Sequence, residues 1–251
     1  MTYCVGLMLD EGMVFLSDTR TNAGLDNISR YRKMFTWEVP GERAIVALTA
    51  GNLAITQAVM STLQEAIDNP ETEPGDCILS APSMFRVAEL MGEAMQKVQH
   101  KYQDTLEQRK ESSSASIMVG GQRKGGAQRL FLVYAAGNFI EATEDTPYLQ
   151  IGEHKYGKPI LDRVITPETP IADGVKAALL SMDSTLRSNL SVGMPLDLAV
   201  LPEGSCHFSE HRRIDAEDAG FKALSDAWSQ ALREAFADMP NIVHRTAKQT
   251  F

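Results

Sequence analysis

Two short segments near the start of the chain are apolar at nearly every position. They cover residues 3–9 and 13–18, and Asp10-Glu11-Gly12 between them is typical of a hairpin turn. Two more strands are predicted at 34–37 and 43–49. A strand without polar alternation is buried on both faces. The pattern therefore predicts a sheet with helices on one side and a second sheet on the other.

Helical periodicity and further strands alternate along the rest of the chain. Apolar residues recur at helical spacing in four segments, which predict helices at 52–68, 83–108, 172–187 and 217–238. Short apolar runs predict strands at 116–120, 129–134, 138–141, 196–201 and 206–208. Helices would then cover both outer faces of paired sheets. We expect an α+β chain folded as a four-layer αββα sandwich, with one domain over 1–240 and a short tail over 241–251.

Composition and charge exclude several classes of protein. The chain has 251 residues, 43% of them hydrophobic, and 33 acidic against 24 basic residues give a net charge of −9. An acidic surface argues against nucleic acid as a partner. No apolar run approaches the roughly 18 residues that span a membrane, and the start does not resemble a secretory signal. Three widely spaced cysteines fit reduced thiols, so we expect a cytoplasmic protein.

Two motifs suggest a metal or a phosphate, and neither is persuasive. His207-Phe208-Ser209-Glu210-His211 matches the H-x-x-E-H pattern of some zinc peptidases, but it follows a turn and runs into two arginines. The glycine-rich segment 120–126 lacks the G-K-[ST] of a phosphate loop and lies between two strands, which favours a hairpin turn. We therefore expect no metal and no cofactor.

The most informative candidate chemistry lies at Thr2. If Met1 is removed, Thr2 carries a hydroxyl and a free α-amine, so the nucleophile brings its own general base. An α-amine has a pKa of about 8, which leaves a useful fraction neutral at pH 7. Asp18 ends the second predicted strand and Lys33 opens the next, and a lysine ammonium favours ionisation of a nearby hydroxyl. Each of the three also has a plain alternative reading, as an ordinary terminal threonine, a turn carboxylate and a solvated lysine.

The joint spacing of these residues resembles the β-type subunits of the proteasome family. The resemblance covers roughly residues 2–201 and is most specific in the first 55, where it includes Thr2, Asp18, the Thr21-x-Ala23-Gly24 loop, Lys33 and Thr49-Ala50-Gly51. The chain looks most like the bacterial ancestral β-subunit group, called Anbu. These are N-terminal-nucleophile hydrolases.

The resemblance implies a role for each matching residue. Thr2 would be nucleophile and amine base, Asp18 and Lys33 its charged pair, and the Gly51 backbone N–H an oxyanion donor. Thr21 and Ala23 would hold a peptide by main-chain hydrogen bonds, and Thr49 would lie near the specificity pocket. Ser191 matches a further catalytic position.

The match weakens downstream of the first 55 residues. Glu153 stands where the family usually has the serine of a Gly-Ser-Gly stretch, and Ser188 stands where an aspartate is usual. Glu153 is expected to act as a substitute polar partner or to lie in a solvated loop. Proton handling around the amine is therefore expected to differ from the family pattern.

The sequence thus predicts a threonine endopeptidase that hydrolyses peptides or unfolded chains through an acyl-enzyme on Thr2. The resemblance implies self-association into a ring-like or helical assembly. Two alternatives stay open. One is amidohydrolysis or acyl transfer on the same fold, because fold does not determine function. The other is a catalytically silent assembly subunit.

Overall fold

The structure is a computed structural model that describes residues 2–22, 28–109 and 112–240. The chain divides into two compact units, Met1–Ala216 and Glu217–Phe251. No helix in the described ranges is both long enough and apolar enough to cross a membrane. The larger unit holds every residue of the candidate site.

The larger unit contains two five-stranded antiparallel sheets. The first has the order β10-β1-β2-β11-β12, and its strands are Tyr148–Gly152, Tyr3–Leu9, Gly12–Asp18, Leu196–Pro202 and Glu210–Ile214. The second has the order β5-β6-β7-β8-β9, and its strands are Met34–Val39, Arg43–Gly51, Ala115–Arg123, Arg129–Val133 and Phe139–Glu141. A separate pair, β3 (Arg20–Asn22) and β4 (Ile28–Arg30), carries the chain from the first sheet toward the second.

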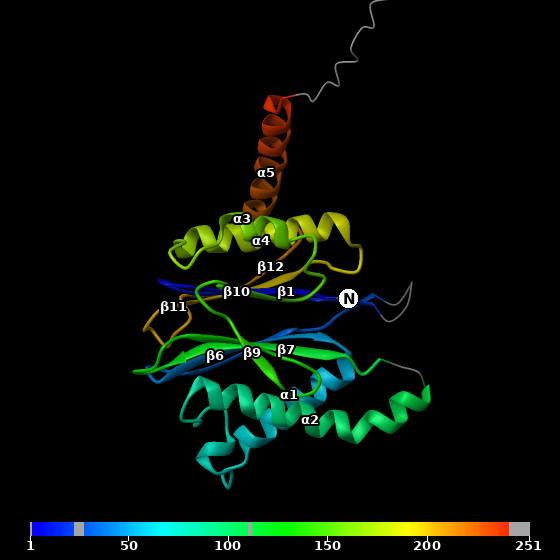
Figure 1. Cartoon of the computed structure of the whole chain (residues 1–251), viewed down its shortest axis with the longest axis vertical. Helices are drawn as coiled ribbons and strands as arrows, with labels where there is room; N and C mark the ends of the chain where they lie inside the picture. The colour runs from blue at the N-terminus through cyan, green and yellow to red at the C-terminus, as the bar shows by residue number, and fades with distance from the viewer. Residues whose placement is uncertain (1, 23–27, 110–111, 241–251) are drawn as a thin grey trace, which may run out of the picture. The chain divides into compact units, whose positions relative to one another are not determined.

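Helices cover the outer face of each sheet. α1 (Leu53–Asp68) and α2 (Met84–Arg109) pack on the second sheet, and α4 (Ile171–Ser188) packs on β1 and β2 beside the short helix α3 (Lys158–Val164). A 3-10 turn, η1, covers Pro74–Asp76. The result is a four-layer αββα sandwich, as the sequence predicted (Figure 1). The smaller unit contains α5 (Ala219–Asp238).

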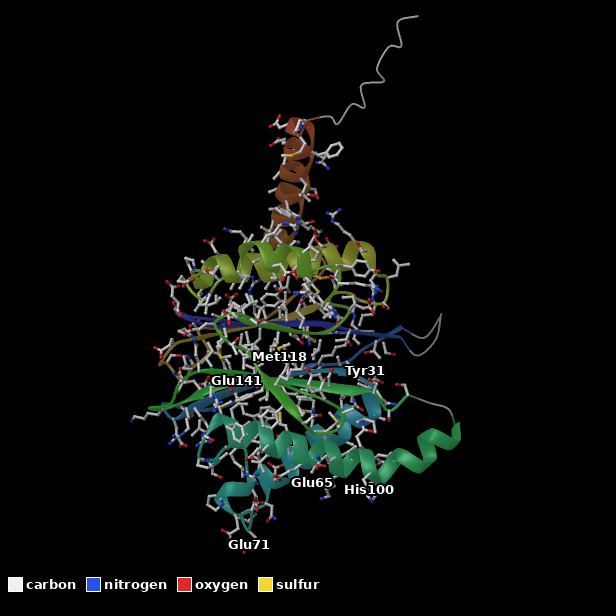
Figure 2. The ribbon with its side chains drawn as sticks, viewed as in Figure 1. Tyr31, Glu65, Glu71, His100, Met118 and Glu141 are labelled. Atoms are coloured by element: carbon white, nitrogen blue, oxygen red, sulfur yellow. The ribbon has the colours of Figure 1, made fainter. Side chains whose placement is uncertain are left out.

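The two cores explain why the strands lack polar alternation. Along β6, Val46 and Leu48 belong to the core between the sheets, whereas Ile45 and Ala47 belong to the core under α1 and α2. A central strand therefore buries both of its faces. Figure 2 shows Met118 between the two sheets, with Glu65 and His100 at the surface of the outer helices.

Most predicted elements are confirmed, and the exceptions have physical causes. The proposed strand at 206–208 is wrong, because β12 begins at Glu210. Cys206 has a left-handed backbone (φ 48°), and both the Phe208 N–H and the His207 ring bond to the Glu38 carboxylate. Residues 207 and 208 are thus bonded to β5 of the second sheet and do not form a strand of the first. The glycine-rich segment at 120–126 is confirmed as part of the β7–β8 hairpin.

The sequence pattern missed several short elements. They are β3, β4, β10, β12 and α3, none longer than seven residues. Periodicity needs a longer window to separate such elements from loops. The missed strand β10 matters most for function, because it pairs with β1 and ends beside Thr2.

The core between the sheets can be tested by a substitution at Phe15. This side chain is fully buried there, so Phe15→Ala should lower the free energy of unfolding by about 3–5 kcal/mol, as other large core truncations do. Chemical denaturation of the purified chain measures this loss. Val164→Ala, at a half-exposed site, is the control and should change the value by less than about 0.5 kcal/mol. Equal effects of the two variants would contradict the assigned core.

Candidate active site

Asp18 is a buried carboxylate at the end of β2. Its Oδ1 accepts from Lys33 Nζ at 2.7 Å and from the Tyr3 backbone N–H at 3.1 Å. Its Oδ2 accepts from the backbone N–H groups of Arg20 and Gly193, each at 3.2 Å. Four donors on one carboxylate hold its position from both sides. The predicted pairing of Asp18 with Lys33 is therefore present.

The burial of this ion pair sets its electrostatics. The Asp18 side chain is 0% exposed and that of Lys33 is 4% exposed. Burial raises the pKa of the Asp18 carboxyl, while the Lys33 ammonium and the backbone N–H donors oppose that rise because they favour the charged form. Removing either partner would leave an uncompensated group in the protein interior.

Lys33 is held at its backbone as well as at its ammonium. Nζ donates a second hydrogen bond, of 2.6 Å, to the Arg20 carbonyl. The Lys33 carbonyl accepts from the Thr49 backbone N–H at 2.9 Å. Lys33 immediately precedes β5, and Thr49 lies near the end of β6. The ammonium is thus anchored to the second sheet and directed at the end of the first.

Thr2 is positioned by the end of β10. Its side chain and backbone together are 7% exposed, and its carbonyl accepts from the Glu153 backbone N–H at 2.7 Å. Gly152 has a left-handed backbone (φ 82°), and a Cβ built there would lie 1.9 Å from the Thr2 carbonyl oxygen. Only glycine permits this approach. Gly152 and Glu153 therefore place the nucleophile candidate through backbone contacts.

Tyr3, the residue after Thr2, anchors β1 to the outer helix layer. The buried Tyr3 hydroxyl hydrogen-bonds Ser181 of α4 and accepts from Gln150 Nε2 at 2.5 Å. Burial, the largest cause, raises the pKa of the Tyr3 phenol, so it stays neutral at ordinary pH. Tyr3 thus holds β1 against α4 and β10, one residue after Thr2.

A pocket of about 440 Å³ opens beside Thr2. It is lined by ten residues from the start of the chain, β3, the position before β5, the end of β6 and the start of α1, namely Thr2, Thr21, Lys33, Thr49, Ala50, Gly51, Asn52, Leu53, Ala54 and Thr56. Five predicted site residues thus share one pocket with each other: Thr2, Thr21, Lys33, Thr49 and Gly51. Asp18 is not a lining residue, but it forms an ion pair with Lys33, which is.

The wall of this pocket is built around the β6–α1 junction. Gly51 has φ 101°, and a Cβ there would lie 2.3 Å from the Ser114 carbonyl oxygen. Asn52 caps α1, because its Oδ1 accepts from the backbone N–H groups of Ala54 and Ile55. A helix N-terminus carries partial positive charge. The Gly51 backbone and the start of α1 therefore border the space next to Thr2.

Ser191 lies apart from this arrangement. The Ser191 hydroxyl hydrogen-bonds Asn189 Oδ1 at 2.5 Å, and Ser191 is not among the described residues that line the pocket. Its turn reaches the site through Gly193, which donates to Asp18. Ala23 lies outside the described residues. The catalytic role of Ser191 and the substrate-binding role of Ala23 stay predictions.

Glu153 and Ser188 occupy the positions where the sequence departs from the family pattern. The Glu153 carboxylate lies 3.7 Å from Lys155 Nζ, with the side chain 18% exposed, while its backbone N–H contacts Thr2. Ser188 is the exposed last residue of α4. The contact that Glu153 makes with Thr2 therefore uses the backbone, which is independent of side-chain identity.

Several contributors to the site were missed in the sequence. They are the backbone donors of Tyr3 and Gly193, the Arg20 carbonyl, Gly152, and the pocket residues Asn52 and Thr56. Gly152 and Asn52 carried usable signals, a glycine in an apolar stretch and a helix-capping residue. Metal chemistry finds no support in the described ranges, where no group of three or more His, Cys, Asp or Glu side chains is placed to hold an ion.

Comparisons with known proteins agree on one family. The family model described as proteasome subunit matches residues 2–201. A structure of an Anbu (Gly-1) mutant from Hyphomicrobium sp. strain MC1 is 46% identical, with a TM-score of 0.89, and the match covers 97% of this chain and 100% of the other. Anbu from Yersinia bercovieri, described as an ancestral beta-subunit, is 43% identical with a TM-score of 0.89, covering 96% and 99%.

A third similar structure is described by its assembly. It is the helical assembly of the Anbu complex from Pseudomonas aeruginosa, 46% identical with a TM-score of 0.90, covering 95% of this chain and 97% of the other. The comparison with curated proteins gives no match.

The Asp18–Lys33 pair can be tested by a double-mutant cycle. Asp18→Asn and Lys33→Met should each lower the free energy of unfolding by about 3–5 kcal/mol, because each leaves the partner unpaired in the interior. The double variant should lose clearly less than the sum. Chemical denaturation gives all four values.

An exposed pair serves as the control for this cycle. Lys176 and Asp173 on α4 form an ion pair of 2.5 Å with both side chains more than half exposed, so Asp173→Asn should cost at most about 1 kcal/mol. Additive losses for Asp18 and Lys33 would show that the two side chains do not depend on each other.

Proposed function

The chain belongs to the proteasome subunit family, within the group of ancestral β-subunits known as Anbu, and we propose that it is a threonine peptidase whose nucleophile is Thr2. The observation that carries this proposal is the grouping of Thr2, Lys33 and Gly51 around one pocket, with Asp18 buried behind Lys33. The proposal requires removal of Met1, which frees the Thr2 α-amine.

In the first step the Thr2 hydroxyl oxygen attacks the carbonyl carbon of the scissile amide, and the α-amine accepts the hydroxyl proton. Lys33, kept charged by Asp18, favours the alkoxide electrostatically. The negative charge that develops on the carbonyl oxygen is stabilised by the Gly51 N–H and the adjoining start of α1. The leaving amine departs with the proton from the α-amine, which leaves an ester on Thr2.

In the second step water hydrolyses this ester, with the α-amine as general base, and the Thr2 hydroxyl is regenerated. The peptide substrate would lie beside β3 and accept main-chain hydrogen bonds at Thr21 and at Ala23. The three described cysteines are free and buried, which agrees with the proposed cytoplasmic location.

We also propose that subunits of this chain associate with one another. The support is the relative from Pseudomonas aeruginosa, which is described as a helical assembly and matches 95% of this chain. Open helical assemblies arise when head-to-tail contacts do not close into a ring. Peptides or unfolded chains would then reach Thr2 inside a multi-subunit particle.

The nucleophile is tested by intact-mass and peptide-mapping spectrometry with an epoxyketone, a probe that needs a hydroxyl and an adjacent free amine. We expect a chain that begins at Thr2 and a single adduct on that residue. Thr2→Ala should give no adduct and lower any peptidase activity by at least about 10³-fold. Thr2→Ser, which keeps both groups, should retain the adduct.

Two outcomes would contradict the proposal. A retained Met1 or an unreactive free Thr2 would favour a silent assembly subunit. An adduct together with hydrolysis of small amides, but not of peptides, would favour amidohydrolase chemistry on the same fold.

The pocket also predicts a substrate preference. Among its described lining residues Lys33 is the single charged side chain, and it is already paired with Asp18, while Thr49, Leu53 and Thr56 are uncharged. A charged substrate side chain would be desolvated without a partner. A peptide panel should therefore give at least about tenfold higher kcat/KM for a small uncharged residue before the cleaved bond than for Arg or Glu. Preference for either charged residue would be inconsistent with this pocket as the specificity site.

A further inference from the structure

Arg20 connects the Asp18–Lys33 pair to a turn about 170 residues later in the chain. Its backbone N–H donates to Asp18 Oδ2 at 3.2 Å, and its carbonyl accepts from Lys33 Nζ at 2.6 Å. Every residue type except proline could make both of these backbone contacts. The side chain of Arg20 therefore has a role that is separate from the role of its backbone.

The turn over residues 189–195, between α4 and β11, supplies one of the donors to Asp18. The Gly193 backbone N–H donates to Asp18 Oδ2 at 3.2 Å. A hydrogen bond to a carboxylate favours its charged form, and the proposed mechanism needs Asp18 charged beside Lys33. Connecting segments are more mobile than the strands and helices they join. The position of the Gly193 donor therefore depends on what holds this turn in place.

The Arg20 side chain contacts the turn at two points. Its Nη1 donates to the Leu190 carbonyl at 2.9 Å. Its guanidinium also lies against Gly193, because a Cβ built on that glycine would lie 2.2 Å from Arg20 Nε and 2.3 Å from Arg20 Cζ. A flat guanidinium suits both contacts, whereas a lysine ammonium is a compact point charge. Arg20 thus spans the turn from Leu190 to Gly193.

The residue before Arg20 holds the other end of the same turn. The Thr19 backbone N–H donates to the Gly193 carbonyl at 3.4 Å, and Thr19 Oγ1 donates to the Pro195 carbonyl at 2.7 Å. These contacts lie where the turn enters β11. Leu190, near the end of α4, has an 87% exposed side chain, and its carbonyl is the one that Arg20 binds. The two neighbouring residues therefore hold opposite ends of the turn.

We propose that Arg20 is a positioning residue for the candidate active site, because its side chain holds the turn in the place where Gly193 donates to Asp18. The inference rests on the proposed function, since it concerns the ion pair that supports Thr2. Without the guanidinium the turn would move, and Asp18 would lose a donor. Asp18 does not line the pocket, so this loss should affect catalysis more than substrate binding.

The first experiment measures hydrogen–deuterium exchange of the full chain by mass spectrometry. Fragmentation of a peptide that covers 189–196 resolves the amide of residue 193. Arg20→Ala and Arg20→Lys should each lower the protection factor of this amide by at least about tenfold, because its hydrogen bond to Asp18 opens more often. A lysine variant that is protected like the parent chain would show that charge alone suffices, which overturns the inference.

The contact with Gly193 is tested by a double-mutant cycle. Gly193→Ala should displace the guanidinium, because the three heavy atoms nearest to the new Cβ all belong to the mobile end of the Arg20 side chain. It should therefore lower protection about as much as Arg20→Ala does. Added to Arg20→Ala, it should have little further effect. Equal effects in both backgrounds would show that Gly193 acts independently of Arg20, which overturns the proposed contact.

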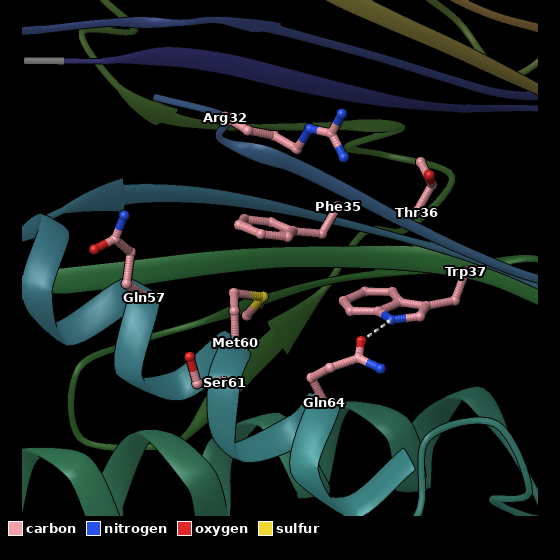
Figure 3. Close-up of a pocket in the computed structure, with 8 residues that line it drawn as sticks. All are labelled: Arg32, Phe35, Thr36, Trp37, Gln57, Met60, Ser61 and Gln64. Carbon is pink, nitrogen blue, oxygen red and sulfur yellow. Dashed lines mark hydrogen bonds between the residues drawn. The ribbon is translucent and has the colours of Figure 1, made fainter. Parts of the chain in front are cut away.

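Two other arginines serve as controls for the exchange measurement. Arg163 on α3 also donates to a backbone carbonyl, that of Pro159, at 2.5 Å. Arg32, one residue before Lys33, lines a groove of about 510 Å³ between β5 and α1 (Figure 3). Arg163→Ala and Arg32→Ala should leave the protection of the Gly193 amide unchanged. A tenfold drop in either variant would show a general effect of charge loss and would overturn the specific role of Arg20.

The second experiment measures peptide hydrolysis. Arg20→Ala should lower kcat by at least about tenfold and change KM by less than about twofold, because the residues that line the pocket are intact. Arg163→Ala should match the parent chain in both constants. Circular dichroism checks that all the variants are folded.

The outcomes separate this inference from the proposed function. A parent chain that neither hydrolyses peptides nor reacts at Thr2 overturns the proposed function and with it the role of Arg20 in catalysis. Unchanged protection in Arg20→Ala overturns the proposed contact, whatever the activity of the parent chain. Lower protection with an unchanged kcat would limit Arg20 to a structural role. A raised KM with an unchanged kcat would make it a determinant of substrate binding. Either result overturns its role as a positioning residue.

Discussion

The buried contact between Asp18 and Lys33 is the interaction on which the site depends. The carboxylate gathers donors from the start of β1, the start of β3, the turn at Gly193 and the segment before β5. These segments come from both sheets, so the ion pair joins the two halves of the sandwich at one edge. A buried ion pair adds little stability by itself, but an unpaired member is costly. The fold therefore tolerates the pair only while all these segments stay in register, and that register also directs the Lys33 ammonium into the pocket beside Thr2.

A second constraint is close backbone approach, which fixes Thr2 and the pocket wall at Gly51 independently of side chains. A Cβ at Gly152 would lie 1.9 Å from the Thr2 carbonyl oxygen, and one at Gly51 would lie 2.3 Å from the Ser114 carbonyl oxygen. Both glycines adopt left-handed backbone conformations, with φ 82° and φ 101°. Larger residues would displace β10 from Thr2 or β6 from β7. The position of Thr2 thus depends on β10, a strand more than 140 residues away in the sequence.

The sequence predicted those parts of the structure that side-chain type encodes. Continuous apolar strands indicated sheets buried on both faces, and the alternation along β6 between the two cores is the physical basis of that pattern. Asp18 and Lys33 were identified because their joint spacing with Thr2 resembles the proteasome family, whereas each residue alone also had a plain alternative reading. The remaining contacts to Asp18 come from backbone N–H groups of Tyr3, Arg20 and Gly193, and every residue type except proline carries such a group. No local pattern distinguishes them, and the proposed strand at 206–208 was wrong for a similar reason, a long-range bond to Glu38.

The pocket beside Thr2 is supported by one strand and one helix of the second sheet and its helix layer. Lys33 immediately precedes β5, and Leu53 and Thr56 lie in the first turns of α1. Phe35 and Trp37 of β5 and Met60 of α1 all pack in the core under α1 and α2. Close-packed elements respond to contact only by small rigid shifts, because their interiors have little free volume. This core therefore restrains both the strand that follows Lys33 and the helix that borders Gly51, so the geometry of the pocket depends on packing outside the pocket.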